Sequence, residues 1–137
     1  MQKVKSTGIP EDVRKQVDET VRRFNESWLK DSGCSYQARY EGKYLYLDRK
    51  EPVGTASICR LKYTGKMDDW EFAIYKYRSD RYDSDEWFFP GMDCVDGTIE
   101  GAMNAGLEAY PVHGSSNLFA KMLNGFKRIA WVANERT

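Results

Sequence analysis

Tyrosines and basic residues alternate with apolar residues along the middle of the chain, and this pattern is suited to ligand recognition. Successive side chains of a strand point to opposite faces, so a sheet that buries the apolar set presents the polar set on its other face. Tyrosine rings stack on planar ligands, while Arg and Lys bind phosphates or carboxylates. The residues that this pattern places on the presented face are Arg39, Tyr44, Tyr46, Arg60, Lys62, Tyr75 and Tyr77.

The same residue types also suit two structural roles. Aromatic pairs stabilise neighbouring strands, and Tyr and Arg are enriched at interfaces between protein copies. The chain carries 21 Lys+Arg and 21 Asp+Glu, so it lacks the basic surplus typical of proteins that bind nucleic acid. We therefore favour packing or dimerisation over ligand recognition on this face, and we keep single-stranded nucleic-acid binding as an alternative.

Residues 78–97 mix acids with aromatics, follow no regular period, and form a candidate binding loop. A hard cation such as Ca²⁺ could take oxygen ligands from Asp80, Asp83, Asp85 and Glu86. Their spacing differs from the calcium-loop pattern and Arg81 lies among them, so we predict a solvated acidic turn and no metal site. Loops of this length in compact domains are often functional. The aromatic residues that this loop offers to a partner are Tyr82, Trp87, Phe88 and Phe89.

Nucleophilic catalysis has little support in the sequence. His113 is the only histidine and lies in a Gly/Ser-rich connection, so a Cys–His or Ser–His pair would have to use it. Cys34, Cys59 and Cys94 are odd in number and widely spaced, which indicates buried reduced thiols rather than a disulfide framework or a zinc site. The catalytic residues therefore stay unassigned.

A phosphate site is conceivable near Thr98, where a helix begins and Gly97 leaves backbone N–H groups accessible. Asp93, Asp96 and Glu100 surround this position, and their charges would repel an anion while they complement the helix dipole. We therefore predict a helix cap there, formed by Asp96 or Thr98. The chain holds no dinucleotide, Walker-type or zinc-protease motif, so we expect no cofactor.

The first element that must position these residues is an amphipathic helix over residues 10–31. Apolar residues recur there at intervals of three and four, which is typical of a helix with one buried face. Pro10 suits its first turn, and Gly33 follows its end. The apolar stripe consists of Val13, Val17, Val21, Phe24 and Trp28.

Four strands follow, because the hydrophobic period changes to two residues after Gly33. Short connections join successive strands, which favours an antiparallel meander because parallel strands need long crossovers. The predicted strands span residues 34–41, 44–47, 56–63 and 70–77.

Two helical segments are predicted after the 78–97 loop. Residues 98–110 form a helix that Pro111 ends. Gly101 and Gly106 indicate that this helix approaches a neighbouring element closely, because each glycine costs about 1 kcal/mol relative to alanine. A second helical stripe covers residues 118–130.

The chain is therefore predicted to be a single α+β domain over residues 1–137. It has an N-terminal helix, a four-stranded antiparallel β-meander, and one or two C-terminal helices packed on the sheet. The core spans about residues 9–111, and residues 112–137 form a helical appendage. No stretch is apolar over the roughly 18 residues that a membrane span needs, so we expect a cytoplasmic protein without a membrane partner.

Three hypotheses on function stay open. The preferred one is a small non-catalytic binding or protein-interaction domain that self-associates as a homodimer or takes a protein or small ligand not yet identified. The second is an enzyme with a pocket between the 78–97 loop and the sheet. The third is single-stranded nucleic-acid binding on the Tyr/Arg sheet face, which the net charge does not support.

Overall fold

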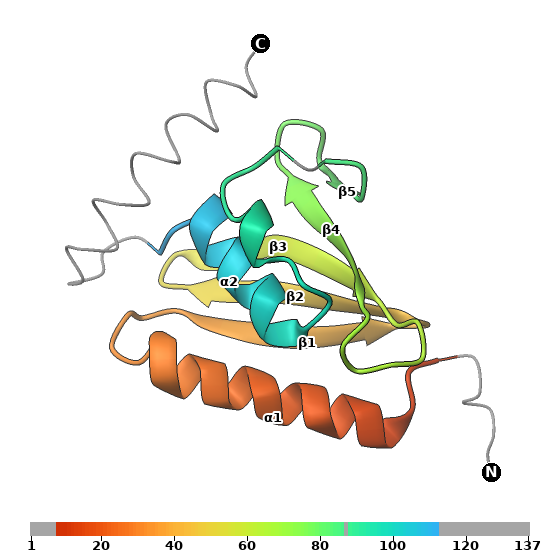
Figure 1. The fold of residues 1–137 in the computed structure, drawn as a ribbon. Helices are drawn as coiled ribbons and strands as arrows, with labels where there is room; N and C mark the ends of the chain where they lie inside the picture. The colour runs from red at the N-terminus through yellow and green to blue at the C-terminus, as the bar shows by residue number, and fades with distance from the viewer. Residues whose placement is uncertain (1–7, 87, 113–137) are drawn as a thin grey trace.

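The structure is a computed structural model and describes residues 8–86 and 88–112. These residues form two α-helices, one 3-10 helix and five strands (Figure 1). In chain order the elements are α1 (Glu11–Trp28), β1 (Ser35–Glu41), β2 (Tyr44–Glu51), β3 (Gly54–Lys62), β4 (Glu71–Lys76), β5 (Arg81–Asp83), η2 (Met92–Cys94) and α2 (Ile99–Ala109).

The strands form one antiparallel sheet in the order β1-β2-β3-β4-β5, which confirms the predicted α+β class and the meander. The sheet has one strand more than predicted. Residues 81–83 were expected to lie in a loop, but they pair with the end of β4 through Tyr75↔Tyr82 and Lys76↔Arg81. This pairing carries one aromatic residue of the predicted loop into the sheet.

A β-bulge interrupts the pairing of β2 with β3. Leu47 pairs with Cys59 and Asp48 pairs with Ser57, so Ile58 is an extra residue on β3. A bulge lets neighbouring residues share one face of a sheet, and both Ile58 and Cys59 are fully buried. Beyond the bulge the alternation is as predicted, with Leu61 buried and Arg60 on the opposite face.

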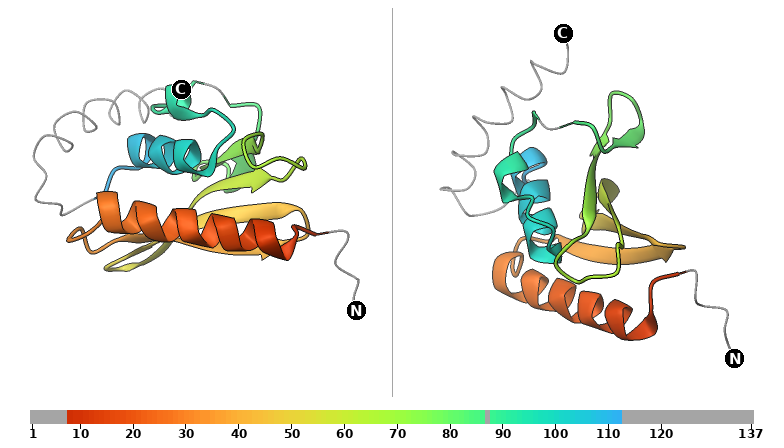
Figure 2. Two further views of the ribbon diagram at one scale, coloured as in Figure 1. Left: turned by 60° about the horizontal axis from the view of Figure 1, so that its bottom comes forward. Right: turned by 45° about the vertical axis from the view of Figure 1, so that its right-hand side comes forward.

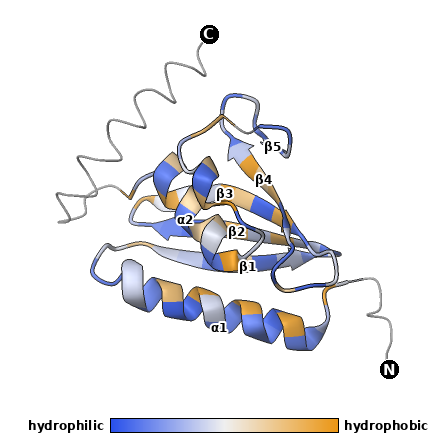
Figure 3. Cartoon of the chain, in the orientation of Figure 1, coloured by the Kyte–Doolittle hydropathy of each residue, from blue (hydrophilic) through white to orange (hydrophobic). Residues whose placement is uncertain are grey.

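Both α-helices pack on the same face of the sheet (Figure 2). α1 packs along β1, while α2 packs on β3 and against α1. Polar and apolar residues alternate around α1 (Figure 3), as an amphipathic surface helix requires. The other face of the sheet is not covered by any helix of the part of the chain that the structure describes.

α1 buries most of the predicted stripe. Val13, Val17, Val21 and Phe24 are buried, which confirms the helical period. Trp28 departs from the prediction, because it is 67% exposed although it contacts Phe24 at a ring-centroid distance of 6.3 Å. Trp28 is the last residue of the helix, and the buried stripe ends one turn before it, at Phe24.

A side-chain amide binds α1 to the edge of the sheet. Asn25 Oδ1 accepts a hydrogen bond from the backbone N–H of Tyr36 (2.8 Å), and Asn25 Nδ2 donates to the Tyr36 carbonyl (3.0 Å). Asn25 thus satisfies both backbone groups that β1 would offer to another strand at this position. An edge strand guarded in this way is less prone to pair with other chains.

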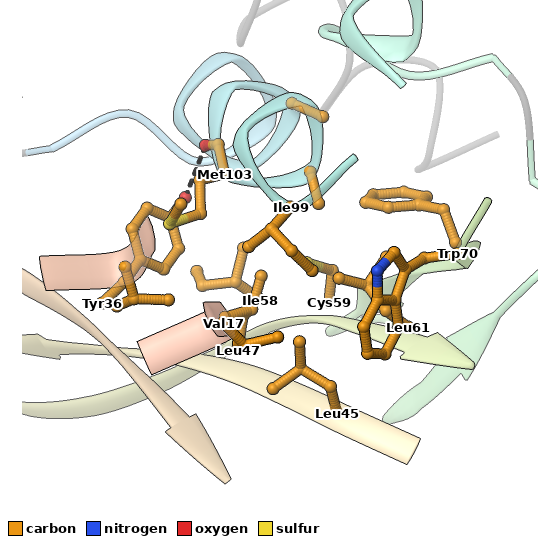
Figure 4. Close-up of a cluster of buried hydrophobic side chains, with 14 of the residues drawn as sticks. Val17, Tyr36, Leu45, Leu47, Ile58, Cys59, Leu61, Trp70, Ile99 and Met103 are labelled. Atoms are coloured by element: carbon orange, nitrogen blue, oxygen red, sulfur yellow. Dashed lines mark hydrogen bonds between the residues drawn. The ribbon is translucent and has the colours of Figure 1, made fainter. Parts of the chain in front are cut away.

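The hydrophobic core lies between the helices and the sheet (Figure 4). Tyr36 is at its centre: its ring packs edge-on against Phe24 at 5.8 Å, and its hydroxyl donates to the carbonyl of Met103 (2.8 Å). One buried side chain therefore connects β1 with both α1 and α2.

α2 begins at a capped turn and approaches its neighbours closely, as predicted. The Thr98 side chain accepts a hydrogen bond from the Gly101 N–H (3.0 Å), and Asp96 in turn accepts from Thr98. A Cβ atom at Gly106 would overlap the Tyr36 hydroxyl and lie 2.5 Å from Cγ2 of Ile58. Glycine is therefore needed where α2 crosses the sheet, despite its cost to the helix.

Two further observations bear on the sequence predictions. None of the helices within residues 8–86 and 88–112 is long and apolar enough to cross a membrane. The helix predicted over residues 118–130 lies outside the described residues.

Candidate functional site

The sheet face opposite the helices carries a layer of aromatic and guanidinium groups. Arg39 and Tyr46 are paired across β1 and β2, and the guanidinium carbon of Arg39 lies 4.4 Å from the centroid of the Tyr46 ring. The same ring contacts Tyr82 of β5 edge-on at 5.3 Å. Residues from an edge strand, a central strand and the last strand therefore meet on one surface.

Arg60 lies at the middle of this layer. Its guanidinium carbon is 4.5 Å from the Tyr44 ring centroid and 5.4 Å from the Tyr82 ring centroid. A guanidinium over an aromatic face is attracted by the ring quadrupole, which is worth about 0.5–1 kcal/mol at exposed sites. Arg60 is therefore held between two rings.

Tyr75 extends the layer along β4. Its ring contacts Tyr82 at 4.9 Å in an edge-to-face arrangement, and such pairs contribute about 0.5–1.5 kcal/mol beyond their burial. We call the continuous surface the tyrosine–arginine face. It consists of Arg39, Tyr44, Tyr46, Arg60, Tyr75 and Tyr82.

The structure brings together most of the residues predicted for this face. Lys62 also lies on this side, at the pair positions of Tyr44 and Glu71. Tyr77 is different: it follows the end of β4, contacts Tyr75 at 4.8 Å, and reaches the opposite face, where its ring contacts Tyr110 at 5.4 Å. It marks the boundary between the tyrosine–arginine face and a cavity described below.

The predicted loop residues divide among three environments. Tyr82 belongs to the tyrosine–arginine face, and Phe88 is 74% exposed. Phe89 is buried and stacks on Phe72 at 5.8 Å with an interplanar angle of 14°. Trp87 lies outside the described residues. Phe89 therefore anchors the loop to the core and is not available to a partner.

One tyrosine of the face has a pKa that an experiment can follow. The Tyr75 hydroxyl donates to Asp80, and this hydrogen bond raises the pKa of Tyr75 to about 12. An unperturbed tyrosine has a pKa of about 10. The contribution of this phenol to stability is therefore complete below pH ~10 and is lost as the pH rises towards the folded-state pKa.

Replacing Asp80 by asparagine should lower the pKa of Tyr75. Asp80 has a positive φ of 55°, which asparagine also tolerates, so the substitution removes the charge without straining the turn. We expect the tyrosinate absorbance of Asp80→Asn to appear at lower pH than that of the wild type. Subtracting the titration curve of Tyr75→Phe from that of the wild type isolates the absorbance change due to Tyr75. If Asp80→Asn titrates at the same pH as the wild type, the hydrogen bond between Tyr75 and Asp80 is contradicted.

A buried charge on the helix side of the sheet escaped the sequence analysis. Arg49 continues the buried alternation of Leu45 and Leu47 along β2, and its side chain is only 2% exposed. Its Nε donates to Oε2 of Glu51 (2.9 Å) and its Nη2 donates to the Tyr110 carbonyl. Nη1 is buried and donates to no acceptor among the described residues. A buried donor without an acceptor costs about 1–3 kcal/mol.

Arg49 forms part of the wall of a cavity of about 140 Å³. Glu51 lies on the same wall, and the rings of Tyr77 and Tyr110 are on the lining as well. The cavity differs in position from the pocket expected between the 78–97 loop and the sheet, because its lining includes no residue of that loop.

The chain matches no protein-family model, no curated protein and no solved structure. Function must therefore be inferred from the geometry of the tyrosine–arginine face.

The remaining sequence candidates do not converge on a reactive centre. Cys34 and Cys59 are buried and Cys94 is partly buried, and none of the three forms a disulfide within the described residues. Burial raises the pKa of Cys59 well above its ordinary value. Within the described residues no three His, Cys, Asp or Glu side chains are placed to hold a metal ion. His113 lies outside those residues.

Proposed function

We propose that this protein is a non-catalytic protein-interaction domain that docks through its tyrosine–arginine face, and that its first partner is a second copy of the same chain. One observation carries the proposal: tyrosine rings and guanidinium groups form a continuous, partly exposed layer on a sheet face that no described helix covers. Tyr and Arg are the residue types that most often dominate the binding energy of protein interfaces.

The rings of this layer are already held in place. Arg60 contacts Tyr44 and Tyr82, and Tyr82 contacts Tyr46. Side chains that keep one conformation in the free protein lose little entropy when a partner binds. The face is thus preorganised for a flat partner surface.

The charges of the face favour a second copy as the partner. Arg39 forms ion pairs with Asp48 (3.0 Å) and Glu41 (3.3 Å), and Lys62 is paired across the sheet with Glu71. Both signs therefore alternate over one surface. A two-fold axis through such a surface brings the acids of one copy against the cations of the other.

A nucleic acid suits this face less well. Binding to phosphates draws on cations that are not already neutralised. Arg39 has two acidic partners on the protein itself, and the chain as a whole has no net charge. The mixed charge pattern supports a protein partner over a polyanion.

Light scattering coupled to size-exclusion chromatography, at two protein concentrations and two salt levels, tests the proposal. We expect the wild type to have the mass of a dimer at the higher concentration. Tyr46→Ala and Arg60→Ala should each weaken the dimer by at least about 2 kcal/mol, or roughly thirtyfold in dissociation constant, because both remove central ring contacts.

Arg23→Ala is the matched control, because this arginine is 72% exposed on α1, away from the tyrosine–arginine face, and forms an ion pair with Glu19. It should leave the dimer unchanged. A wild type that stays monomeric at every concentration would refute the second copy as the partner. If the monomer then binds a single-stranded oligonucleotide with an affinity that falls steeply with salt and is lost in Tyr46→Ala, the nucleic-acid alternative takes its place.

A further inference from the structure

We propose that the outer face of α2 is a docking surface for residues 118–130 of the same chain. All other residues of α2 are buried, and at intervals of four, seven and eight the exposed or half-buried ones share one side of the helix. The surface is independent of the tyrosine–arginine face, because α2 packs on the opposite side of the sheet (Figure 2). The outer face of α2 consists of Glu100, Asn104, Leu107 and Glu108.

Two exposed apolar residues lie beside this face. Phe88 is 74% exposed and Met92 is 37% exposed, and the backbone N–H of Met92 donates to the Phe89 carbonyl (3.1 Å) in the turn that joins them. η2, which contains Met92, packs on α2, and a Cβ atom at Gly91 would lie 2.7 Å from Cβ of Glu108. Apolar side chains gathered at one exposed place of a domain are typical of an interaction surface.

The segment that follows α2 has a sequence pattern suited to this surface. Apolar residues recur over 118–130 at the spacing of an amphipathic helix, and Lys121 and Lys127 lie at the two borders of the stripe when the segment is drawn as a helix. A helix of about this length is marginally stable in water on its own, so a helix here needs a surface that covers its stripe. The stripe consists of Leu118, Phe119, Met122, Leu123, Phe126, Ile129 and Ala130.

The two partners carry opposite charges. Residues 80–108 hold eight acidic residues and one basic residue, Arg81, whereas residues 113–137 hold four basic residues and one acidic residue, Glu135. The neutral chain therefore combines an acidic part with a basic part. Opposite charges favour the association of two surfaces and disfavour other partners for each of them.

The connection between α2 and the segment determines which charges meet. Only residues 110–117 separate α2 from the stripe, and short connections place successive helices antiparallel and side by side. A segment attached in this way is also present at a high effective concentration near α2. In the antiparallel arrangement Lys121 lies near Glu108, at the end of α2. Lys127 then lies near Glu100, at its beginning.

Amide hydrogen exchange and proton–nitrogen correlation spectra of the full chain test the proposal. We expect the amides of residues 118–130 to exchange at least about tenfold more slowly than those of an unfolded chain. Phe126→Asp places a charge in the middle of the stripe, so it should remove this protection and shift the signals of Asn104 and Leu107. Fast exchange of the segment in the wild type would overturn the proposal, even if Phe126→Asp fails to fold.

A charge swap tests the position of the segment on α2. Glu100→Lys and Lys127→Glu should each reduce the protection about threefold, because each brings like charges together. The double variant should recover most of it. Arg128→Glu is the matched control, since Arg128 lies on the side of the predicted helix away from the stripe, and it should leave the protection unchanged. A double variant no better protected than the single variants would overturn docking on the outer face of α2.

The alternative occupant of the surface is residues 118–130 of a second copy. Protection that disappears on dilution to the monomer, or in Tyr46→Ala, would assign the segment to the second copy and overturn docking within one chain. Protection that persists in a monomeric wild type would support this inference while refuting the proposed function, so the two failures are distinguishable.

Discussion

Replacing Tyr36 by alanine should destabilise the fold by about 3–5 kcal/mol, the usual cost of truncating a fully buried aromatic residue. Tyr36 is 2% exposed and packs against Phe24 of α1, while its hydroxyl binds the Met103 carbonyl of α2. The substitution removes both contacts and opens a cavity under Gly106, where α2 is packed too closely to collapse without moving. Urea denaturation measures the effect as a lower midpoint.

Tyr36→Phe separates the two contributions. It keeps the ring against Phe24 and removes only the hydrogen bond, so we expect a loss of about 1–3 kcal/mol for the buried Met103 carbonyl left without this donor. Tyr46→Ala, on the partly exposed face, is the matched tyrosine control and should cost less than Tyr36→Ala. Similar midpoints for Tyr36→Ala and Tyr46→Ala would contradict the central position of Tyr36 in the core.

The sequence predicted the fold because its periods are regular where the elements are long. Apolar residues at intervals of three and four predict the ends of α1 to within about one turn. Strict alternation along β2 predicts that Leu45 and Leu47 lie on one face of the sheet and Tyr44 and Tyr46 on the other. The tyrosine–arginine face could be predicted for the same reason, since strand parity decides which residues share a side of the sheet.

Three features could not be predicted, each for a different physical reason. β5 has only three residues, which is too short to display a period, so Tyr82 was assigned to the loop. Ile58 is the extra residue of a bulge in β3. The sequence shows only that two apolar residues, Ile58 and Cys59, are adjacent, and this does not distinguish a bulge from a regular strand. Tyr77 continues the alternation of β4 in sequence, but the strand ends at Lys76 and Tyr77 begins a turn.

Arg49 was missed because a charged residue at a core position contradicts the rule that charges stay in water. The parity of β2 would have placed it on the buried face with Leu47. Its partners could not be found in the same way, because the Tyr110 carbonyl is 61 residues away along the chain and becomes a neighbour only in the fold. Periodicity therefore predicts that Arg49 is buried, but it does not identify the groups that Arg49 binds.

Replacing Arg49 by alanine is expected to cost about 3–5 kcal/mol, comparable to the loss of Tyr36. Breaking a buried ion pair by removing one partner leaves the other without compensation. Arg49→Ala also removes the donor to the Tyr110 carbonyl and the guanidinium that lies 5.8 Å from the Tyr36 ring centroid, together with the apolar stem of the arginine. Urea midpoints at constant m-value provide the measurement.

Arg49→Met distinguishes packing from charge. Methionine refills most of the stem volume without a charge, and uncharged replacements of buried ion pairs are often tolerated. Glu51 is 18% exposed and can be partly hydrated once its partner is gone, so we expect Arg49→Met to be at least about 1 kcal/mol more stable than Arg49→Ala. If the two variants unfold at the same midpoint, the ion pair and not the stem holds this corner of the sheet together. If Arg49→Ala is as stable as the wild type, the buried ion pair with Glu51 does not contribute to the stability of the fold.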